Sequence, residues 1–131
     1  MKQEDKDLLL KDLCGRLPYG VKCAIQGEKK VYTLSRVECD YKNGHLFDFV
    51  EQKNGFNMQV YTSEVKPYLF PLDSMTDEQK EEWKSLVIRE AFSESDGTLT
   101  VQDFYNKNHI DYRGLIEKGL AVNATGLDIY K

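Results

Sequence analysis

The sequence lacks the features that mark membrane, secreted and disordered proteins. Its longest apolar runs, Leu8–Leu10 and Leu86–Ile88, are far shorter than the roughly 20 residues that a membrane helix needs. The first residues, MKQEDKD, have mixed charge and no apolar run of the kind that a secretory signal contains. There are only three prolines, and 40% of the residues are hydrophobic, which is enough for a core. We expect a globular, cytoplasmic protein with no membrane span.

Residues that bind metals are few and scattered. The cysteines Cys14, Cys23 and Cys39 form no C-x-x-C pair, and each lies among apolar neighbours. The two histidines, His45 and His109, lie far apart and have no cysteine or histidine at ligand spacing. We therefore expect buried free thiols and no metal site.

Catalytic motifs are also absent. The sequence has no G-x-S-x-G, no Gly-rich phosphate loop, no H-E-x-x-H and no Cys–His pair with an orienting residue. Its many carboxylates have no spacing that indicates a general acid or base. We expect a protein that is not an enzyme and that needs no cofactor.

One segment, SESDGTLTVQDF at residues 93–104, resembles a calcium loop in part. With Gly97 as the turn glycine at position six of an EF-hand loop, Phe92 falls at position one, where a carboxylate must bind the ion. Position twelve becomes Asp103 instead of the usual bidentate glutamate. A plain helical corner is the preferred interpretation.

Charge is spread unevenly along the chain. The net charge is −4, and it comes from residues 72–131, which have 7 Lys and Arg against 12 Asp and Glu, whereas residues 1–71 have 11 against 10. An acidic chain does not favour a protein that coats nucleic acid by neutralising phosphates. The difference indicates two unlike halves.

The first half predicts a helix followed by a small sheet. The helix is indicated by leucines at helical spacing and ends near Gly15 and Pro18. Four strands follow between Gly20 and Leu72, with Tyr68–Phe70 as an optional fifth, and two Asn-Gly pairs mark tight turns. The strands are Val21–Ile25, Val31–Cys39, Leu46–Val50 and Phe56–Tyr61, with a one-turn break at Thr62–Val65. Short strands joined by tight turns favour a strongly bent antiparallel sheet of the SH3-like or Sm-like barrel type.

The second half predicts about three helices. A capping box starts the first of them, at Thr76 and Gln79, and Thr100, three residues before Asp103, caps the second. On the first, Trp83, Leu86, Val87 and Ala91 form a stripe that Ile88 and Phe92 widen, and we interpret this stripe as core. The third helix covers residues 111–119 and carries Tyr112, Leu115 and Ile116 inward. The fold class is therefore α+β, divided at residues 1–72 and 73–131, and the two parts can also pack as one compact domain.

The last two predicted helices, at residues 100–108 and 111–119, also have the layout of a DNA-reading helix-turn-helix. The reading helix would offer Arg113 and Lys118 against Asp111 and Glu117, so its attraction for phosphate would be weak. Helical packing is the preferred interpretation.

Basic and aromatic residues alternate in the β half. Small barrels bind single strands with such residues, because basic side chains follow the phosphates and aromatic faces stack on bases. Lys29, Lys30, Arg36 and Tyr32 are the candidate nucleic-acid-binding residues. Acidic residues are almost as numerous in the same segments, so a core role for the aromatic residues is the alternative.

Two segments, KPYLFPLDSMTDEQKEEW (66–83) and HIDYRGLIEKGLAV (109–122), resemble segments of short uncharacterised proteins from Bacteroides-type gut bacteria and their prophages. The resemblance implies a phage or mobile-element gene and carries no known activity. That setting suits a protein that binds another protein or nucleic acid and does not choose between them. Because catalytic motifs are missing and the chain is acidic, an interaction module that binds a protein partner is the preferred interpretation. Binding of single-stranded nucleic acid through the β half is the alternative.

Overall fold

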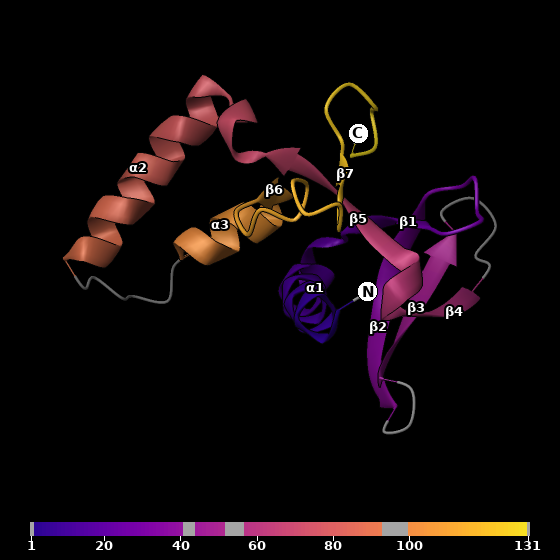
Figure 1. The fold of residues 1–131 in the computed structure, drawn as a ribbon. Coiled ribbons are helices and arrows are strands. Elements are labelled where there is room, and N and C mark those ends of the chain that lie inside the picture. The colour runs from indigo at the N-terminus through magenta and orange to yellow at the C-terminus, as the bar shows by residue number, and fades with distance from the viewer. Residues whose placement is uncertain (1, 41–43, 52–56, 93–99, 131) are drawn as a thin grey trace.

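The computed structural model describes residues 2–40, 44–51, 57–92 and 100–130, and it has the predicted α+β class with an N-terminal helix. Figure 1 shows the arrangement of its helices and strands. The helices are α1 (Gln3–Arg16), α2 (Asp77–Ala91) and α3 (Val101–Lys107). The strands are β1 (Lys22–Ile25), β2 (Tyr32–Asp40), β3 (Gly44–Glu51), β4 (Asn57–Tyr61), β5 (Val65–Pro71), β6 (Ile110–Asp111) and β7 (Val122–Asn123). Single 3₁₀ turns lie at Leu17–Tyr19, Thr62–Glu64 and Leu72–Ser74, and the second of them confirms the predicted break before β5.

The sheet is open. Its strand order is β4-β3-β2-β1-β5-β6, and β7 also pairs with β5. Pairing is antiparallel from β4 to β5, whereas β6 and β7 run parallel to β5. Within the described residues, β4 pairs with β3 alone, so the strand path ends there instead of returning to β5. The predicted SH3-like or Sm-like barrel is therefore not confirmed, and the sheet is mixed instead of purely antiparallel.

A bulge in β2 changes which side chains face the core. Tyr32 and Leu34 are buried, as alternation from the strand start requires, but the register with β3 shifts between Leu34 and Arg36. After this shift Val37 packs against the core. A bulge adds one residue to a strand and so reverses the alternation beyond it. The core side of β2 thus changes at the bulge from the even-numbered to the odd-numbered positions. Both Asn-Gly turns contain residues that lie outside the described part.

The main hydrophobic core lies between α1 and the sheet, and residues 115–121 close it. Its buried members come from α1 (Leu9, Leu13), from β1 to β5 with Val21 before them, and from Leu115, Leu120 and Ala121 near the C-terminus. A second cluster joins α2 to α3 through Leu86, Phe104 and Ile110. Both sides of residue 72 thus contribute to the main core, and the division at residues 72 and 73 stays a prediction.

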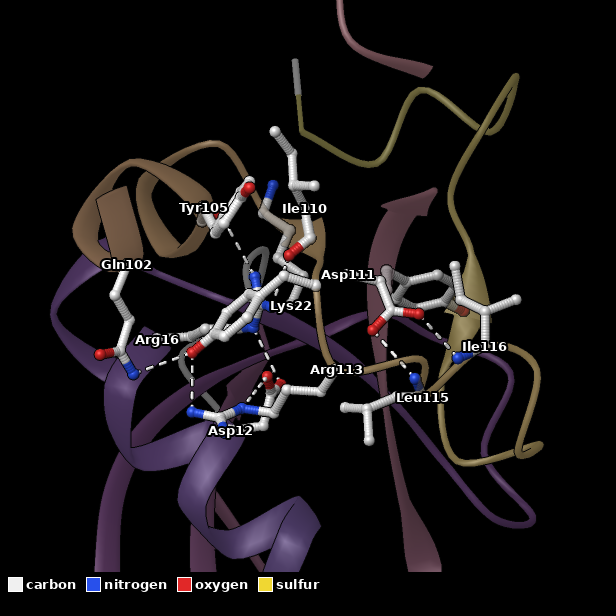
Figure 2. Close-up of polar contacts among 12 residues, drawn as sticks. Asp12, Arg16, Lys22, Gln102, Tyr105, Ile110, Asp111, Arg113, Leu115 and Ile116 are labelled. Carbon is white, nitrogen blue, oxygen red and sulfur yellow. Dashed lines mark hydrogen bonds and ion pairs between the residues drawn. The ribbon is translucent and has the colours of Figure 1, made fainter. Parts of the chain in front are cut away.

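A fully buried ion pair lies on the inner face of α1. Asp12 and Arg16, four residues apart, are both 0% exposed, and Arg16 Nε is 2.8 Å from Asp12 Oδ2. The remaining donors of Arg16 reach the second half of the chain, where Nη2 donates to the Ile110 carbonyl at 2.6 Å and Nη1 to the Tyr105 carbonyl at 3.4 Å (Figure 2). A buried charge is tolerated only when it is paired and hydrogen-bonded, so this guanidinium needs α3 and β6 in place.

The segment after β6 forms no helix. The Asp111 carboxylate accepts the Leu115 and Ile116 amides at 2.9 Å each (Figure 2), and Gly114 has φ +75°. These contacts fold residues 112–120 into successive turns, because the carboxylate captures amides that a helix would use and Gly114 adopts a left-handed conformation. The predicted helix at 111–119 is wrong, and with it the helix-turn-helix interpretation.

The three helices lie side by side, with α3 between α1 and α2 (Figure 1). Gly15 of α1 allows this approach, since a Cβ at this position would lie 3.0 Å from the Asn106 amide nitrogen of α3. The predicted capping box at Thr76 is confirmed, and Thr100 caps α3 as predicted, also in a capping box. α2 is therefore the helix farthest from the sheet.

Replacing Arg16 with Met should remove much of the stability of the whole chain. The variant leaves the Asp12 carboxylate buried with Arg113 as its remaining partner, whose Nε is 3.3 Å from Asp12 Oδ1. Loss of one member of a buried ion pair costs about 3–5 kcal/mol. Urea unfolding followed by circular dichroism measures the change. The control, Lys11→Met on the exposed side of the same helix, should change the free energy of unfolding by less than about 0.5 kcal/mol. Equal effects of the two variants would contradict a central role for Arg16.

Candidate functional site

The residues predicted to bind nucleic acid do not form a common stacking surface. Lys29 and Lys30 are exposed in the connection between β1 and β2. Tyr32 is 2% exposed, and its hydroxyl donates to the Glu28 carboxylate at 3.3 Å. A ring buried in the core cannot offer its face to a base. The candidates that remain, Lys29, Lys30 and Arg36, are cationic, and none of them is aromatic.

Arg36 lies beyond the β2 bulge and is paired with acids. Its side chain is 60% exposed, forms an ion pair with Glu38, and lies 3.2 Å from the Asp48 carboxylate. A strand rises about 3.3 Å per residue, which places Arg36 roughly 13 Å along β2 from its first residue, Tyr32, whereas Lys29 and Lys30 precede the strand. The structure therefore keeps Arg36 apart from the two lysines and compensates its charge locally.

The inner face of α2 is fastened to α3 by polar contacts as well as by apolar packing. Trp83 Nε1 donates to the Tyr105 hydroxyl at 2.7 Å, and the Glu90 carboxylate accepts the Val101 amide at 2.8 Å. Leu86, which lies between Trp83 and Glu90 on the same face, is 5% exposed. These residues are spaced by three and four, so they form a single line along the helix. This side of α2 is fixed in position.

Outside this line, α2 and its C-terminal cap residue carry four apolar residues that are exposed. Val87 is 37% exposed, Ile88 57% and Phe92 74%, and Ala91 is exposed as well. At 100° per residue, Ile88 lies opposite the line through Trp83 and Leu86. Val87 and Ala91 form one i,i+4 pair and Ile88 and Phe92 another, so the four side chains are neighbours. We name them the α2 apolar patch, and the interpretation of these four residues as core was wrong.

The first two turns of α2 are acidic. Asp77, Glu78, Glu81 and Glu82 are all exposed. Lys84 pairs with Glu81 at 3.6 Å, with side chains 61% and 77% exposed, so this pair is well solvated and weak. We name the four carboxylates the α2 acidic turns.

Residues near the C-terminus hold β1 and β5 together, and we name these contacts the Tyr130 latch. The Tyr130 hydroxyl accepts the Lys22 amide at 2.9 Å and donates to the Tyr68 carbonyl at 2.7 Å, so it bridges β1 and β5. The Lys22 ammonium donates to the Ile129 carbonyl at 2.8 Å. Burial raises the pKa of the Tyr130 hydroxyl, which keeps its proton for this bridge.

His109 stacks on the ring of Tyr130. The ring centroids are 3.7 Å apart with an angle of 10° between planes, and His109 has φ +57°. Burial, together with the nearby positive charges of Arg16 and Lys22, lowers the pKa of His109 from its ordinary value of 6.5 to about 4. The folded state therefore favours the neutral form of the His109 imidazole.

The remaining candidates among the described residues are a hollow and the cysteines. A shallow hollow of about 450 Å³ lies where β1, the turn after β4 and β5 meet, with Gln26, Glu64 and Lys66 on its wall. Cys23 is buried as predicted, and burial raises its pKa, whereas Cys14 is exposed and the prediction of a buried thiol there was wrong. The side chain of Cys39 lies outside the described part. No cluster of three His, Cys, Asp or Glu residues able to hold a metal occurs in the ranges that the structure describes.

Comparison with known proteins gives no match: no family model, no curated protein and no solved structure matches the chain. The resemblance to Bacteroides-type and prophage proteins therefore stays a prediction. In the part of the chain that the structure covers, no helix has the length and apolar character needed to cross a membrane.

Lowering the pH from 6.5 to 4 should reduce the stability of the folded chain, because the unfolded chain takes up a proton at His109. In this interval the unfolded chain binds a proton at His109 and the folded chain does not, so the free energy of unfolding rises with pH. We expect the wild type to lose more stability than His109→Asn when the pH is lowered from 6.5 to 4, because asparagine does not titrate and tolerates positive φ. Urea unfolding at several pH values measures the difference, and parallel curves for the two proteins would contradict it.

Proposed function

We propose that the protein is a non-enzymatic interaction module of the cytoplasm, and that it binds a protein partner through the α2 apolar patch. The observation that carries this proposal is the exposure of four neighbouring apolar side chains of α2 and its cap residue, outside the line that packs against α3. Single exposed apolar residues are ordinary, but a contiguous group at helical spacing is typical of an interaction site.

The spacing of the patch fits a known mode of recognition. Helices that bind grooves or other helices present apolar anchors at i, i+3, i+4 and i+7. Ile88 and Phe92 supply such an i,i+4 pair, and Val87 and Ala91 lie beside them. Phenylalanine and isoleucine bury a large apolar area, and burial of that area is the main source of affinity at such contacts.

The patch is held rigidly before a partner arrives. The bonds of Trp83 and Glu90 fix the rotation of α2 on α3. α3 is in turn tied to α1 by Arg16, which donates to the Tyr105 carbonyl. A preformed surface loses less conformational entropy on binding, so even a small apolar contact can support measurable affinity.

Panning a random peptide library against the immobilised protein tests the proposal. We expect selected peptides to bind wild type and to lose about tenfold or more in affinity for the double variant Ile88→Gln and Phe92→Gln, since each truncated anchor removes 1 kcal/mol or more. The control is Leu127→Gln, which removes an exposed apolar side chain (49%) outside α2. Fluorescence anisotropy measures affinity, and thermal unfolding checks that all variants fold. Equal affinity for the wild type and the double variant would contradict the proposal.

Single-stranded nucleic-acid binding through Lys29, Lys30, Arg36 and Tyr32 is the rival function. The buried ring of Tyr32 and the ion pairs of Arg36 support the protein-binding proposal over it. Titration of labelled single-stranded and duplex oligonucleotides at low and near-physiological salt separates the two functions. We expect flat curves at micromolar protein. A salt-dependent micromolar affinity that Lys29→Gln and Lys30→Gln remove would favour the rival.

Two further parts of the proposal concern the family and the setting. β1 lies between β2 and β5, and one 3₁₀ turn joins β4 to β5, which supports an SH3-like or Sm-like arrangement of these strands despite the open edge of the sheet. The phage or mobile-element setting rests on the resemblance of residues 66–83 and 109–122.

A further inference from the structure

The outer face of α2 changes character along its length. Glu81 lies seven residues before Ile88 and Asp77 four residues earlier still, so both fall on the stripe that leads to the α2 apolar patch. With a rise of about 1.5 Å per residue, Glu81 is roughly 10 Å and Asp77 roughly 17 Å from Ile88 along the helix axis. The surface therefore has an apolar end and an acidic end.

The acidic end has more carboxylates than the helix start requires. Asp77 and Glu78 lie in the first turn, where they favour the positive end of the helix dipole, but Glu81 and Glu82 lie beyond it. Lys80 and Lys84 offset part of this charge, so residues 77–84 hold four acids against two lysines. The whole segment 72–131 is also acidic, with 12 Asp and Glu against 7 Lys and Arg. The potential around this surface is therefore negative.

We propose that the partner of α2 is a protein segment with apolar anchors at one end and Lys or Arg residues about 10–17 Å away, which lie against the α2 acidic turns while the anchors cover the α2 apolar patch. This inference rests on the proposed protein-binding function and names the chemistry of the partner. Complementary charges raise the rate of association and select against acidic segments.

Other occupants of the same face are less suited to it. A second copy of this chain carries the same net charge of −4, so it brings like charge toward the acidic turns. An anionic lipid surface repels them in the same way, because membrane-binding helices carry Lys and Arg on their polar face. A basic segment is the occupant for which both ends of the surface are attractive.

The composition of the peptides selected on wild type tests this inference directly. We expect an excess of Lys and Arg on one side of a pair of apolar residues, and an affinity that falls as salt rises. For a selected peptide, the double variant Glu81→Lys and Glu82→Lys should lose about three- to tenfold in affinity, as expected for two solvent-exposed charge pairs. The control is Glu117→Lys, a charge reversal at an exposed acid outside α2.

The outcomes separate the two proposals. Selected peptides that are neutral or acidic, or that bind the Glu81→Lys and Glu82→Lys variant as well as they bind wild type, would overturn the basic partner. If those peptides still lose affinity for the Ile88→Gln and Phe92→Gln variant, the protein-binding function stands without it. If no peptide depends on Ile88 and Phe92, both proposals fail. Dimers of the protein alone in analytical ultracentrifugation, abolished by Phe92→Gln, would assign the patch to a second copy and overturn the inference.

Discussion

The buried pair of Asp12 and Arg16 is the constraint on which the other contacts of this fold depend. Both side chains are fully buried, and the guanidinium is neutralised within α1 but completes its hydrogen bonds only at carbonyls of α3 and β6. Asp12 also lies 3.3 Å from Arg113 Nε, so one carboxylate faces two guanidinium groups from distant parts of the chain (Figure 2). An unpaired charge at this depth would be costly, and the pair therefore favours only those arrangements in which the second half of the chain is docked.

The position of α2 follows from this docking. α3 lies against α1, and its seven residues are about 10 Å long, whereas the fifteen residues of α2 are about 22 Å long. α3 is shorter than α2 and lies on one side of it (Figure 1), and the apolar side chains outside this contact are exposed. The Tyr130 latch ties the C-terminal segment to β1 and β5. The α2 apolar patch is thus a consequence of how few partners the helix has.

Local signals in the sequence predicted the parts of the fold that depend on local contacts. The helix caps at Thr76 and Thr100, the first helix and the turn before β5 were confirmed, because each depends on residues within a few positions of one another. The segment after β6 was predicted as a helix because its apolar spacing is helical, and the capture of amides by Asp111 outweighs that spacing. The patch was taken for core because an apolar stripe does not reveal how much of it a neighbour covers. Asp12 and Arg16 gave no signal, since an i,i+4 ion pair is equally common on exposed helices.

Mapping the contact surface in solution shows directly whether a partner binds the α2 apolar patch. Backbone amide resonances of the isotope-labelled protein would be followed by NMR while a peptide selected on wild type is added. We expect the largest shifts at residues 84–92, which form the C-terminal part of α2 and its cap, and no shift of the amide resonances of β2 and β3. Shifts concentrated on β2 and the connection that carries Lys29 and Lys30, with α2 unchanged, would contradict this expectation and move the binding surface to the sheet.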